Sequence, residues 1–426
     1  MTGLVKLKSV EDLLAYCENV ERTQLPADAA QSMCGVYADS KWTGMLTALD
    51  PFSQDYEKLC LSLYGELSGV LEYDPLVNER TPYVDLARTV SSPTPFQYGD
   101  SLYISDFMLS WGWIFRNLNV KAGARILEYG AGEAQLSIQL ARMGCDVAIV
   151  DIDERYLDAV KAQCDSLKIS MELQKGQFGD AIRDRRFDRI VFFEAFHHAL
   201  HHAVVLEKLK PLLAEGGFIL FSGEPIVDPA SVLVPFAWGP RLDGISVRSM
   251  RKFGWCELGF QRPYFVERLM RSGYLVTHSP CPVTGRGDCF MAKPMPINED
   301  IAMGLPYLLE VHGSNSGWHE GEVSHRWTSD RALFTLPQMP HLDSATVRVV
   351  NYLPEVQQIL LRCGPVSVSA SLASGERATL TLKLPRGERY IVITTPAKRP
   401  QDVLQENADS RCLGIAVETI RLETEV

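Results

Sequence analysis

The feature that most constrains this chain is a regular alternation of apolar strand patterns and amphipathic helix patterns between about residues 102 and 295. Strand-like runs such as RILEYG, DVAIVDID and RIVFFEAF are separated by helical patterns such as EAQLSIQLARMG. The strand runs are apolar at nearly every position, as in sheets that are covered on both faces. The alternation therefore predicts an α/β fold with a parallel, doubly wound sheet.

Two regions with different patterns flank this segment. Before it, EDLLAYCENVE and YEKLCLSLYGELSGVL carry apolar residues at helical spacing, and a stretch rich in Ser, Pro and Gly follows. After it, segments such as TVRVVNYL and RYIVITTP alternate with period two and are separated by Gly and Pro turns, which predicts an all-β sandwich. We expect an N-terminal helical region over 1–95, an α/β domain over 96–295 and a β-sandwich over 305–426.

Composition and charge narrow the function classes. The net charge is −11 and the pI is about 5.4, so a phosphate backbone is repelled and nucleic acid is not expected as a partner. The ten cysteines contain no C-x-x-C pair, which is typical of buried thiols in a reducing compartment. The N-terminus lacks the apolar core of a signal peptide, and no apolar run is long enough for a membrane span. We expect a soluble, cytoplasmic protein; whether it forms a homo-oligomer stays open.

The first strand–helix junction, RILEYGAGEAQLSIQLA, indicates a ligand site. Gly130 and Gly132 allow a tight turn and a closer ligand approach than any Cβ permits, and the following helix N-terminus offers free N–H groups. The next strand ends at Asp151, about 20 residues further on, where an acid bonds a ribose diol in such folds. This combination favours an adenosine-type ligand over a purely structural glycine turn.

Two adenosine-type ligands fit such a junction, a dinucleotide and S-adenosylmethionine. The dinucleotide fingerprint requires a third small residue five positions after the first glycine, and this position is Gln135. Glu128 directly precedes the turn, where a carboxylate repels a pyrophosphate but suits the cationic amino group of S-adenosylmethionine. The residues therefore favour the methyl donor.

From about 124 to 225 the chain resembles the class I S-adenosylmethionine-dependent methyltransferase family. The E/D-x-G-x-G motif of the family matches Glu128, Gly130 and Gly132, and its acid after the second strand matches Asp151. FDRIVFFEAFHH and LKPLLAEGGFILFSGEP resemble its fourth strand and the run into its fifth, and LVTHSPCPV with CFMAKP resembles the antiparallel pair that closes its sheet. The resemblance implies a Rossmann-like methyltransferase domain over 96–295 with S-adenosyl-L-methionine as cofactor.

The resemblance also implies which residues line the donor. The acid that usually follows the third strand of the family aligns with Gln177, next to Phe178, which departs from the family pattern. The residues that we expect to bind the cofactor are Glu128, Tyr129, Gly130, Gly132, Asp151, Ile152, Gln177, Phe178 and Glu194.

The ends of the fourth and fifth strands carry the candidate catalytic groups. Ligands in open α/β sheets lie beyond these strand ends, and transfer of a methyl group to an oxygen needs in-line positioning and removal of a proton. His198, His197, Glu194 and Glu224 are the candidate bases. Alternatively, the two histidines only shape the donor pocket. The histidines at 197, 198, 201 and 202 have a spacing that suits a metal, but no third ligand type is evident, so we expect none.

The stretch 227–262 is long for a connection across the active face and is expected to form a lid or an acceptor wall. Trp238, Arg241 and Asp243 mix aromatic and charged groups, as a sugar or acid acceptor requires; the alternative is a structural flap with its Trp residues in the core. Tyr98 and Tyr103, just before the first helix of the α/β segment, are candidates for closing over the donor.

The last region resembles β-sandwich modules of bacterial glycan-assembly enzymes, in its opening GWHEGEVSHRWT and its ending LGIAVETIRL. Trp318 and Trp327 offer flat faces to a sugar, or belong to the sandwich core. The leading hypothesis is a methyltransferase that O-methylates a saccharide or glycan precursor. The alternatives are methylation of a natural product or small acid, and a catalytically inert glycan-binding or scaffold protein.

Overall fold

The computed structural model describes residues 5–23, 35–81, 84–94, 100–182, 184–404 and 407–425. The chain divides into two compact units. The first comprises Met1–Phe265 and Ser279–Met291, and the second comprises Val266–His278 and Ala292–Val426. The first unit contains the predicted α/β sheet, and the second contains the period-two strands.

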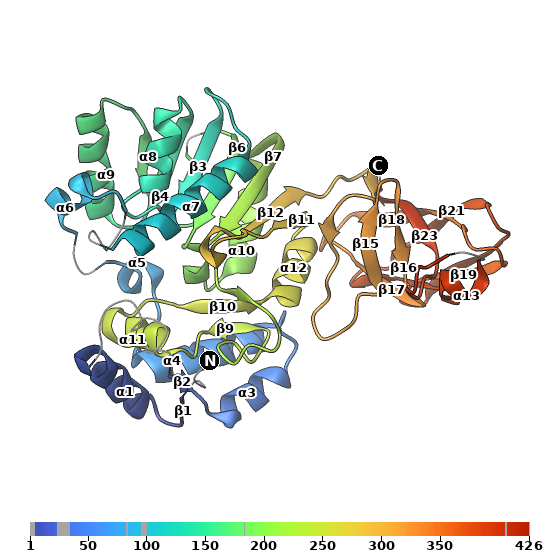
Figure 1. Ribbon diagram of the computed structural model, residues 1–426, viewed down its shortest axis with the longest axis horizontal. Coiled ribbons are helices and arrows are strands. Elements are labelled where there is room, and N and C mark those ends of the chain that lie inside the picture. Colours follow the sequence, from blue (N-terminus) through green and yellow to red (C-terminus); the bar gives the residue numbers. More distant parts are fainter. Residues whose placement is uncertain are drawn as a thin grey trace. The chain divides into compact units, whose positions relative to one another are not determined.

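The centre of the first unit is a parallel sheet (Figure 1). Its parallel strands are β3 (Arg125–Tyr129), β4 (Asp146–Asp151), β5 (Glu172–Lys175), β6 (Phe187–Phe193) and β7 (Leu213–Ser222). The spatial order is β7-β6-β3-β4-β5, so the chain runs outward from β3 to β5 and then returns to the other side with β6. A ligand site is expected where this order reverses, at the carboxyl ends of β3 and β6. The predicted doubly wound fold is confirmed.

Helices cover this sheet because their apolar stripes match its apolar strands. They are α7 (Ser101–Leu118), α8 (Gln135–Arg142), α9 (Glu154–Leu167) and α10 (His202–Leu209). Side chains of α7, α8 and α9 share one buried core with the sheet, for example Trp111, Leu140 and Val160 against Ile126 and Ile149. Asp100 caps α7 and Asp153 caps α9 through their carboxylates. These contacts fix the helix that follows each strand and therefore the turns at the strand ends.

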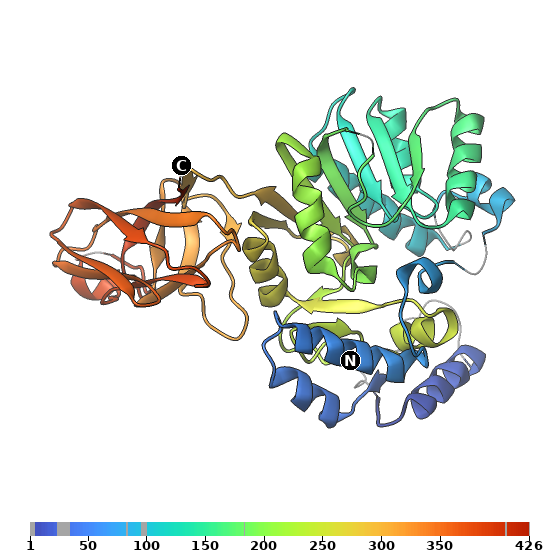
Figure 2. The same cartoon turned by 180° about the vertical axis from the view of Figure 1, so that it is seen from behind.

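Most of the N-terminal elements and the long insertion after β7 form one layer beside the sheet, whereas the last N-terminal helix, α6, packs on α9 (Figures 1 and 2). The N-terminal elements are β1 (Lys6–Leu7), α1 (Val10–Thr23), β2 (Val36–Tyr37), α3 (Ser40–Thr47), α4 (Gln54–Ser68), α5 (Pro75–Asn78) and α6 (Leu86–Ser91). The insertion supplies β8 (Ile226–Val227), β9 (Trp238–Pro240), α11 (Gly244–Phe253) and β10 (Leu258–Gln261), with the sheet order β8-β10-β9. Helix α11 packs on α4 and α1, and the Tyr56 hydroxyl donates to the Trp238 carbonyl at 2.8 Å.

The chain leaves this layer through α12 (Arg262–Arg271) and the neighbouring strands β11 (Tyr274–Ser279) and β12 (Cys289–Pro294). These two strands are the pair that the sequence predicts after the insertion. Among the described residues, the helices do not combine the length and apolar character that crossing a bilayer requires.

The second unit is built from antiparallel strands in two sheets, which confirms the predicted C-terminal β region. One sheet has the order β15-β16-β23-β18-β21 with β13 beside β23, and the other has the order β17-β22-β19-β20. Its strands are β13 (Asp300–Ala302), β14 (Tyr307–Leu308), β15 (Trp318–Glu322), β16 (His325–Thr328), β17 (Arg331–Thr335), β18 (Leu342–Val350), β19 (Gln357–Cys363), β20 (Val366–Leu372), β21 (Arg377–Lys383), β22 (Tyr390–Thr394) and β23 (Ala416–Thr424); a short helix, α13 (Pro400–Val403), precedes the last strand. The short strand β14 belongs to neither sheet and pairs with β11.

The two tryptophans near the start of the sandwich, Trp318 and Trp327, make contacts within it. Trp327 is buried, and the indole N–H of Trp318 donates to the Leu333 carbonyl at 2.7 Å. Arg326 is also occupied, because its guanidinium donates to the carbonyls of Leu305 and Tyr307. For Trp327 the structure supports the core, whereas Trp318 is half-buried.

Candidate active site

The turn between β3 and α8 has the backbone that its glycines predict. Gly130 and Gly132 have φ angles of +65° and +52°, in the left-handed region that glycine adopts without strain. A Cβ at Gly130 would lie 3.0 Å from the Phe178 ring and 3.1 Å from the Ala195 Cβ. The loop after β6 therefore packs directly against this turn, and a side chain at Gly130 would disturb both.

Asp151 lies beside this turn because β3 and β4 are adjacent parallel strands that end at the same edge. Its carboxylate accepts from the Gly132 N–H at 3.3 Å and from the Asp153 N–H at 2.8 Å. Burial raises the pKa of Asp151 to about 6, although these N–H groups lower it. The predicted glycines and the predicted acid thus form one structural group, which we call the donor turn (Gly130, Gly132 and Asp151).

Glu128 lies beneath the donor turn. Its carboxylate is buried and accepts a hydrogen bond from the Ser137 hydroxyl of α8. Burial raises the pKa of Glu128 to about 7, and the nearby charge of Asp151 acts in the same direction. The observed role of Glu128 is to tie the strand to the helix after the turn; contact with the amino group of a donor stays a prediction.

The raised pKa of Glu128 predicts that the ionised carboxylate lowers the stability of the folded protein, which can be measured. Because the folded value of about 7 exceeds the ordinary 4.5, the folded state binds the proton between these values and the unfolded state does not. The protonated carboxyl group therefore contributes to the free energy of unfolding at low pH, and this contribution is lost as the pH rises from 4.5 through 7. We expect Glu128→Gln, which keeps the acceptor for Ser137, to raise the free energy of unfolding at pH 8 by about 2 kcal/mol and to leave it nearly unchanged at pH 4.

Urea unfolding of donor-free protein at pH 8 and pH 4 measures this difference. Glu215→Gln is the control, because Glu215 is an exposed residue of β7. A Glu128→Gln protein that is less stable than the parent at pH 8 would show that the ionised carboxylate is required for folding.

The remaining residues predicted to bind the cofactor differ in position. Phe178 is half-buried and lies edge-on to Tyr129 and Phe192, against the donor turn. Ile152 is half-buried next to Asp151, and Gln177 is exposed. The Tyr129 side chain is fully buried and its hydroxyl donates to the Asp180 carbonyl at 2.6 Å, so only its backbone reaches the donor turn. A contact of the cofactor with the Tyr129 backbone stays a prediction.

Glu224, a predicted base, organises the loop after β6. Its carboxylate accepts from the N–H groups of Ala195, Phe196 and His197 at 2.8 to 3.0 Å. It also accepts from Nδ1 of His197 at 2.9 Å. Burial by itself raises the pKa of Glu224, but these bonds outweigh burial and lower it. A carboxylate engaged in four hydrogen bonds is a poor proton acceptor, so its assignment as a base is corrected to positioning of His197.

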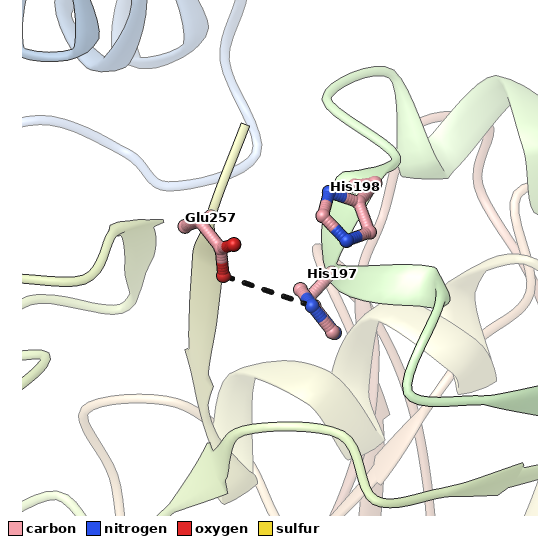
Figure 3. A group of neighbouring side chains, drawn as sticks. All are labelled: His197, His198 and Glu257. Carbon is pink, nitrogen blue, oxygen red and sulfur yellow. Dashed lines mark ion pairs between the residues drawn. The ribbon is translucent and has the colours of Figure 1, made fainter. Parts of the chain in front are cut away.

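Two glutamates that sequence reasoning did not identify complete the surroundings of the histidine pair. Nδ1 of His198 lies 3.0 Å from the Glu79 carboxylate, and Nε2 of His197 lies 3.8 Å from the Glu257 carboxylate (Figure 3). Glu257 also forms an ion pair with Arg241, a predicted acceptor residue. We call His197, His198, Glu79, Glu224 and Glu257 the histidine–glutamate cluster. Its members come from four separate parts of the sequence.

The contacts of Glu79 explain why it takes a fixed position. Its other carboxylate oxygen accepts from the Tyr73 hydroxyl at 2.7 Å and from the Cys256 N–H at 2.6 Å. Burial lowers the pKa of His198, but the charges of Glu79 and Glu257 outweigh this effect and raise it to about 9. Burial and the neighbouring His198 lower the pKa of His197. The two adjacent imidazoles therefore differ in their affinity for a proton.

Glu194, the last candidate base, belongs to a second charged group. It has a φ of +52°, and its carboxylate forms an ion pair with Arg286. Arg286 also pairs with Asp106 at 3.2 Å, and its guanidinium lies 5.6 Å from the ring centre of Tyr103. Tyr103, at the start of α7, therefore lies beside this charged group. Arg286 and Asp106 were not identified from the sequence.

Two predicted acceptor contacts have other roles in the structure. Trp238 is buried and its indole N–H donates to the Pro51 carbonyl at 2.9 Å. Asp243 caps α11, since it accepts from the N–H and the hydroxyl of Ser246 at 2.9 and 2.8 Å. Both predictions are corrected to structural roles, because the inserted segment packs into the N-terminal layer. Tyr98 lies outside the described residues.

Comparisons show which known proteins are similar to the part of the chain that contains the donor turn. Residues 126–217 match a protein family described as methyltransferase domain. A ubiquinone biosynthesis O-methyltransferase of Bradyrhizobium diazoefficiens is 26% identical over 107 residues, which cover 25% of this chain and 42% of that protein. An uncharacterized methyltransferase of Staphylococcus carnosus is 31% identical over 100 residues, which cover 24% of this chain and 46% of that protein. The chain thus spans less than half the length of these curated relatives.

Solved structures are similar over a larger part of the chain. Magnesium protoporphyrin IX methyltransferase of Synechocystis, with bound S-adenosylmethionine, has 12% identity and a TM-score of 0.38, and covers 53% of this chain and 100% of its own. The 1,6-didemethyltoxoflavin-N1-methyltransferase of Burkholderia thailandensis has 17% identity and a TM-score of 0.35, and covers 51% and 93%. The family match identifies residues 126–217 as a methyltransferase domain, the type of domain that the sequence predicts.

Proposed function

We propose that this protein is an S-adenosylmethionine-dependent methyltransferase that O-methylates a hydroxyl group of a saccharide or glycan precursor. The observation that carries the proposal is that two groups of residues lie at the ends of the neighbouring strands β3 and β6. The donor turn at Gly130 adjoins Ala195, and the histidine–glutamate cluster begins two residues after Ala195. A donor methyl group and a proton-accepting group would thus meet at one place.

The donor turn suits the adenosine part of the cofactor. Its glycines place no side chain over the turn, and α8 starts at Gln135, so the positive end of a helix dipole lies next to the turn and suits the carboxylate of the donor. Asp151 takes the position of an acid that bonds a ribose diol. Its present bond to the Gly132 N–H is long, at 3.3 Å, and is the contact that a ribose would replace or share.

The histidine–glutamate cluster suits an acceptor hydroxyl. Methyl transfer to oxygen requires the oxygen lone pair in line with the carbon–sulfur bond and removal of the hydroxyl proton. His197 and His198 follow β6 by a few residues, and we assign the handling of this proton to the pair. Arg241 and Arg286 add cationic groups in the same unit, which suits a polyhydroxylated or acidic acceptor.

The saccharide as acceptor is supported by the resemblance of the C-terminal sandwich to glycan-assembly modules. A second candidate is a small hydroxylated molecule, which the names of the curated ubiquinone biosynthesis O-methyltransferases favour. The inert scaffold is disfavoured because Glu128, Gly130, Gly132 and Asp151 are all retained.

Incubation of the purified chain with S-adenosylmethionine and two acceptor panels tests this proposal. One panel contains nucleotide sugars and oligosaccharides, and the other contains phenols and small acids. We expect a mass increase of one methylene group on a sugar hydroxyl, with an equal yield of S-adenosylhomocysteine. Methylation confined to the second panel would contradict the saccharide assignment, and a protein that does not bind the donor at millimolar concentration would contradict the enzyme assignment.

A further inference from the structure

Three metal-ligating side chains converge in the histidine–glutamate cluster. His197, His198 and Glu257 each place one ligand atom within 4.8 Å of the other two (Figure 3). Their side chains are largely enclosed, with 10%, 22% and 8% of their surfaces exposed. The two histidines are adjacent on a short turn, and the glutamate lies just before β10 of the inserted segment. Two imidazoles and one carboxylate form a common ligand set for divalent transition metals.

The orientation of His197 is the observation that indicates a cation. Its Nδ1 lies 2.9 Å from Glu224, a carboxylate that can only accept, so Nδ1 carries the proton. In the neutral ring, Nε2 then presents a lone pair, and this lone pair faces the Glu257 carboxylate at 3.8 Å. Two acceptors that face each other in a buried site repel unless a positive group lies between them.

His198 repeats this arrangement. Its Nδ1 lies 3.0 Å from Glu79, and Figure 3 shows its other ring nitrogen on the side of His197 and Glu257. A carboxylate on the far nitrogen of a histidine is the usual second layer of a metal site, because it fixes the tautomer and makes the near nitrogen a stronger ligand. Glu224 and Glu79 supply this second layer for the two histidines.

The charges of the cluster fit one divalent ion. Glu79, Glu224 and Glu257 carry three negative charges, and Arg241 supplies one positive charge through its ion pair with Glu257. Both imidazoles would be neutral when they bind an ion, so two negative charges would remain in the enclosed site, and one divalent ion would balance them. The oxygen of Glu257 that faces His197, Oε2, also pairs with Arg241, so a bound ion would share this oxygen with Arg241 or take the second oxygen of the carboxylate.

We propose that His197, His198 and Glu257 bind one divalent transition-metal ion, held in place by Glu224 and Glu79. The role of this ion in catalysis rests on the proposed function: the ion would bind the acceptor oxygen and stabilise its negative charge beside the donor turn. The sequence does not reveal the site, because the third ligand lies almost 60 residues from the histidines. The proposed metal site differs from the sequence analysis, which predicts no metal.

Titration of the chelator-treated full chain with Co²⁺, followed by visible absorption, tests the site without donor or acceptor. We expect one Co²⁺ per chain with ligand-field bands of nitrogen and oxygen ligands, and displacement of Co²⁺ by Zn²⁺. His197→Gln and Glu257→Gln should abolish the bands, and Glu79→Gln should weaken Co²⁺ binding about 10- to 100-fold, as expected for a residue behind a ligand.

His201→Gln is the matched control, because His201 has a side chain that is 56% exposed and pairs with Glu57 outside the cluster. This variant should bind Co²⁺ like the parent, and circular dichroism confirms that each variant is folded. If the parent does not bind Co²⁺, or if binding persists in folded His197→Gln and Glu257→Gln, the inference is wrong. Since no methyl transfer is involved, a protein that binds Co²⁺ but methylates nothing contradicts only the proposed function.

Discussion

Replacing Gly130 by alanine is expected to weaken S-adenosylmethionine binding by about 100-fold or more, which corresponds to about 2.7 kcal/mol. One part of this loss is the strain of an L-residue at a φ of +65°, roughly 1–2 kcal/mol. The other part is steric, because the new Cβ lies 3.0 Å from the Phe178 ring and 3.1 Å from the Ala195 Cβ. Both neighbours flank the donor turn, so their displacement changes the site that receives the donor. Isothermal titration calorimetry with S-adenosylmethionine measures the effect.

Gly123→Ala separates this loss from a general effect of strain. Gly123 has a φ of +84°, and its Cβ would meet no atom within 4 Å. It precedes β3 at the end opposite the donor turn, so the control carries a comparable backbone strain without the steric contact. We expect normal donor binding in Gly123→Ala. Equal donor affinity of the Gly130→Ala protein and the parent would show that the donor binds elsewhere.

Replacing His198 by glutamine is expected to lower kcat by about 100-fold or more while the Kd for S-adenosylmethionine changes little, because His198 belongs to the cluster that activates the acceptor hydroxyl, and an activating group contributes about 10²- to 10⁴-fold. His198 lies in the histidine–glutamate cluster and is fixed by Glu79. The donor turn does not include it. Steady-state rates at saturating donor, together with calorimetry, separate the two effects.

His201→Gln again serves as the control, since it removes an imidazole three residues away that pairs with Glu57. It should keep the kcat of the parent. A His198→Gln enzyme with the parental kcat, or one that loses donor binding in parallel with activity, would contradict the assignment of His198 to the acceptor side.

The sheet and the donor turn were predictable because local patterns determine them. Apolar runs define the strands, glycines define the left-handed turn, and the parallel order brings Asp151 next to Gly132. His197 and His198 were predictable for the same reason, because they follow a strand whose end lies at the ligand edge.

The positions of Glu79 and Glu257 in the cluster were not predictable, because they depend on tertiary packing. Glu79 precedes the sheet by more than 40 residues, and Glu257 lies in an insertion with no repeating pattern. Their approach depends on the packing of α11 on α4 and α1, which local propensity does not encode. The same packing buries Trp238 and makes Asp243 a helix cap, so residues that looked suited to an acceptor became structural.

The most direct test of this account is a crystal structure of the chain with S-adenosylhomocysteine. The ribose diol should bond to the Asp151 carboxylate, the amino acid part should lie over Gly130 and Gly132, and the sulfur should face His197 and His198. A nucleoside bound at another edge of the sheet, or a donor turn that stays filled by Phe178 at saturating ligand, would contradict it.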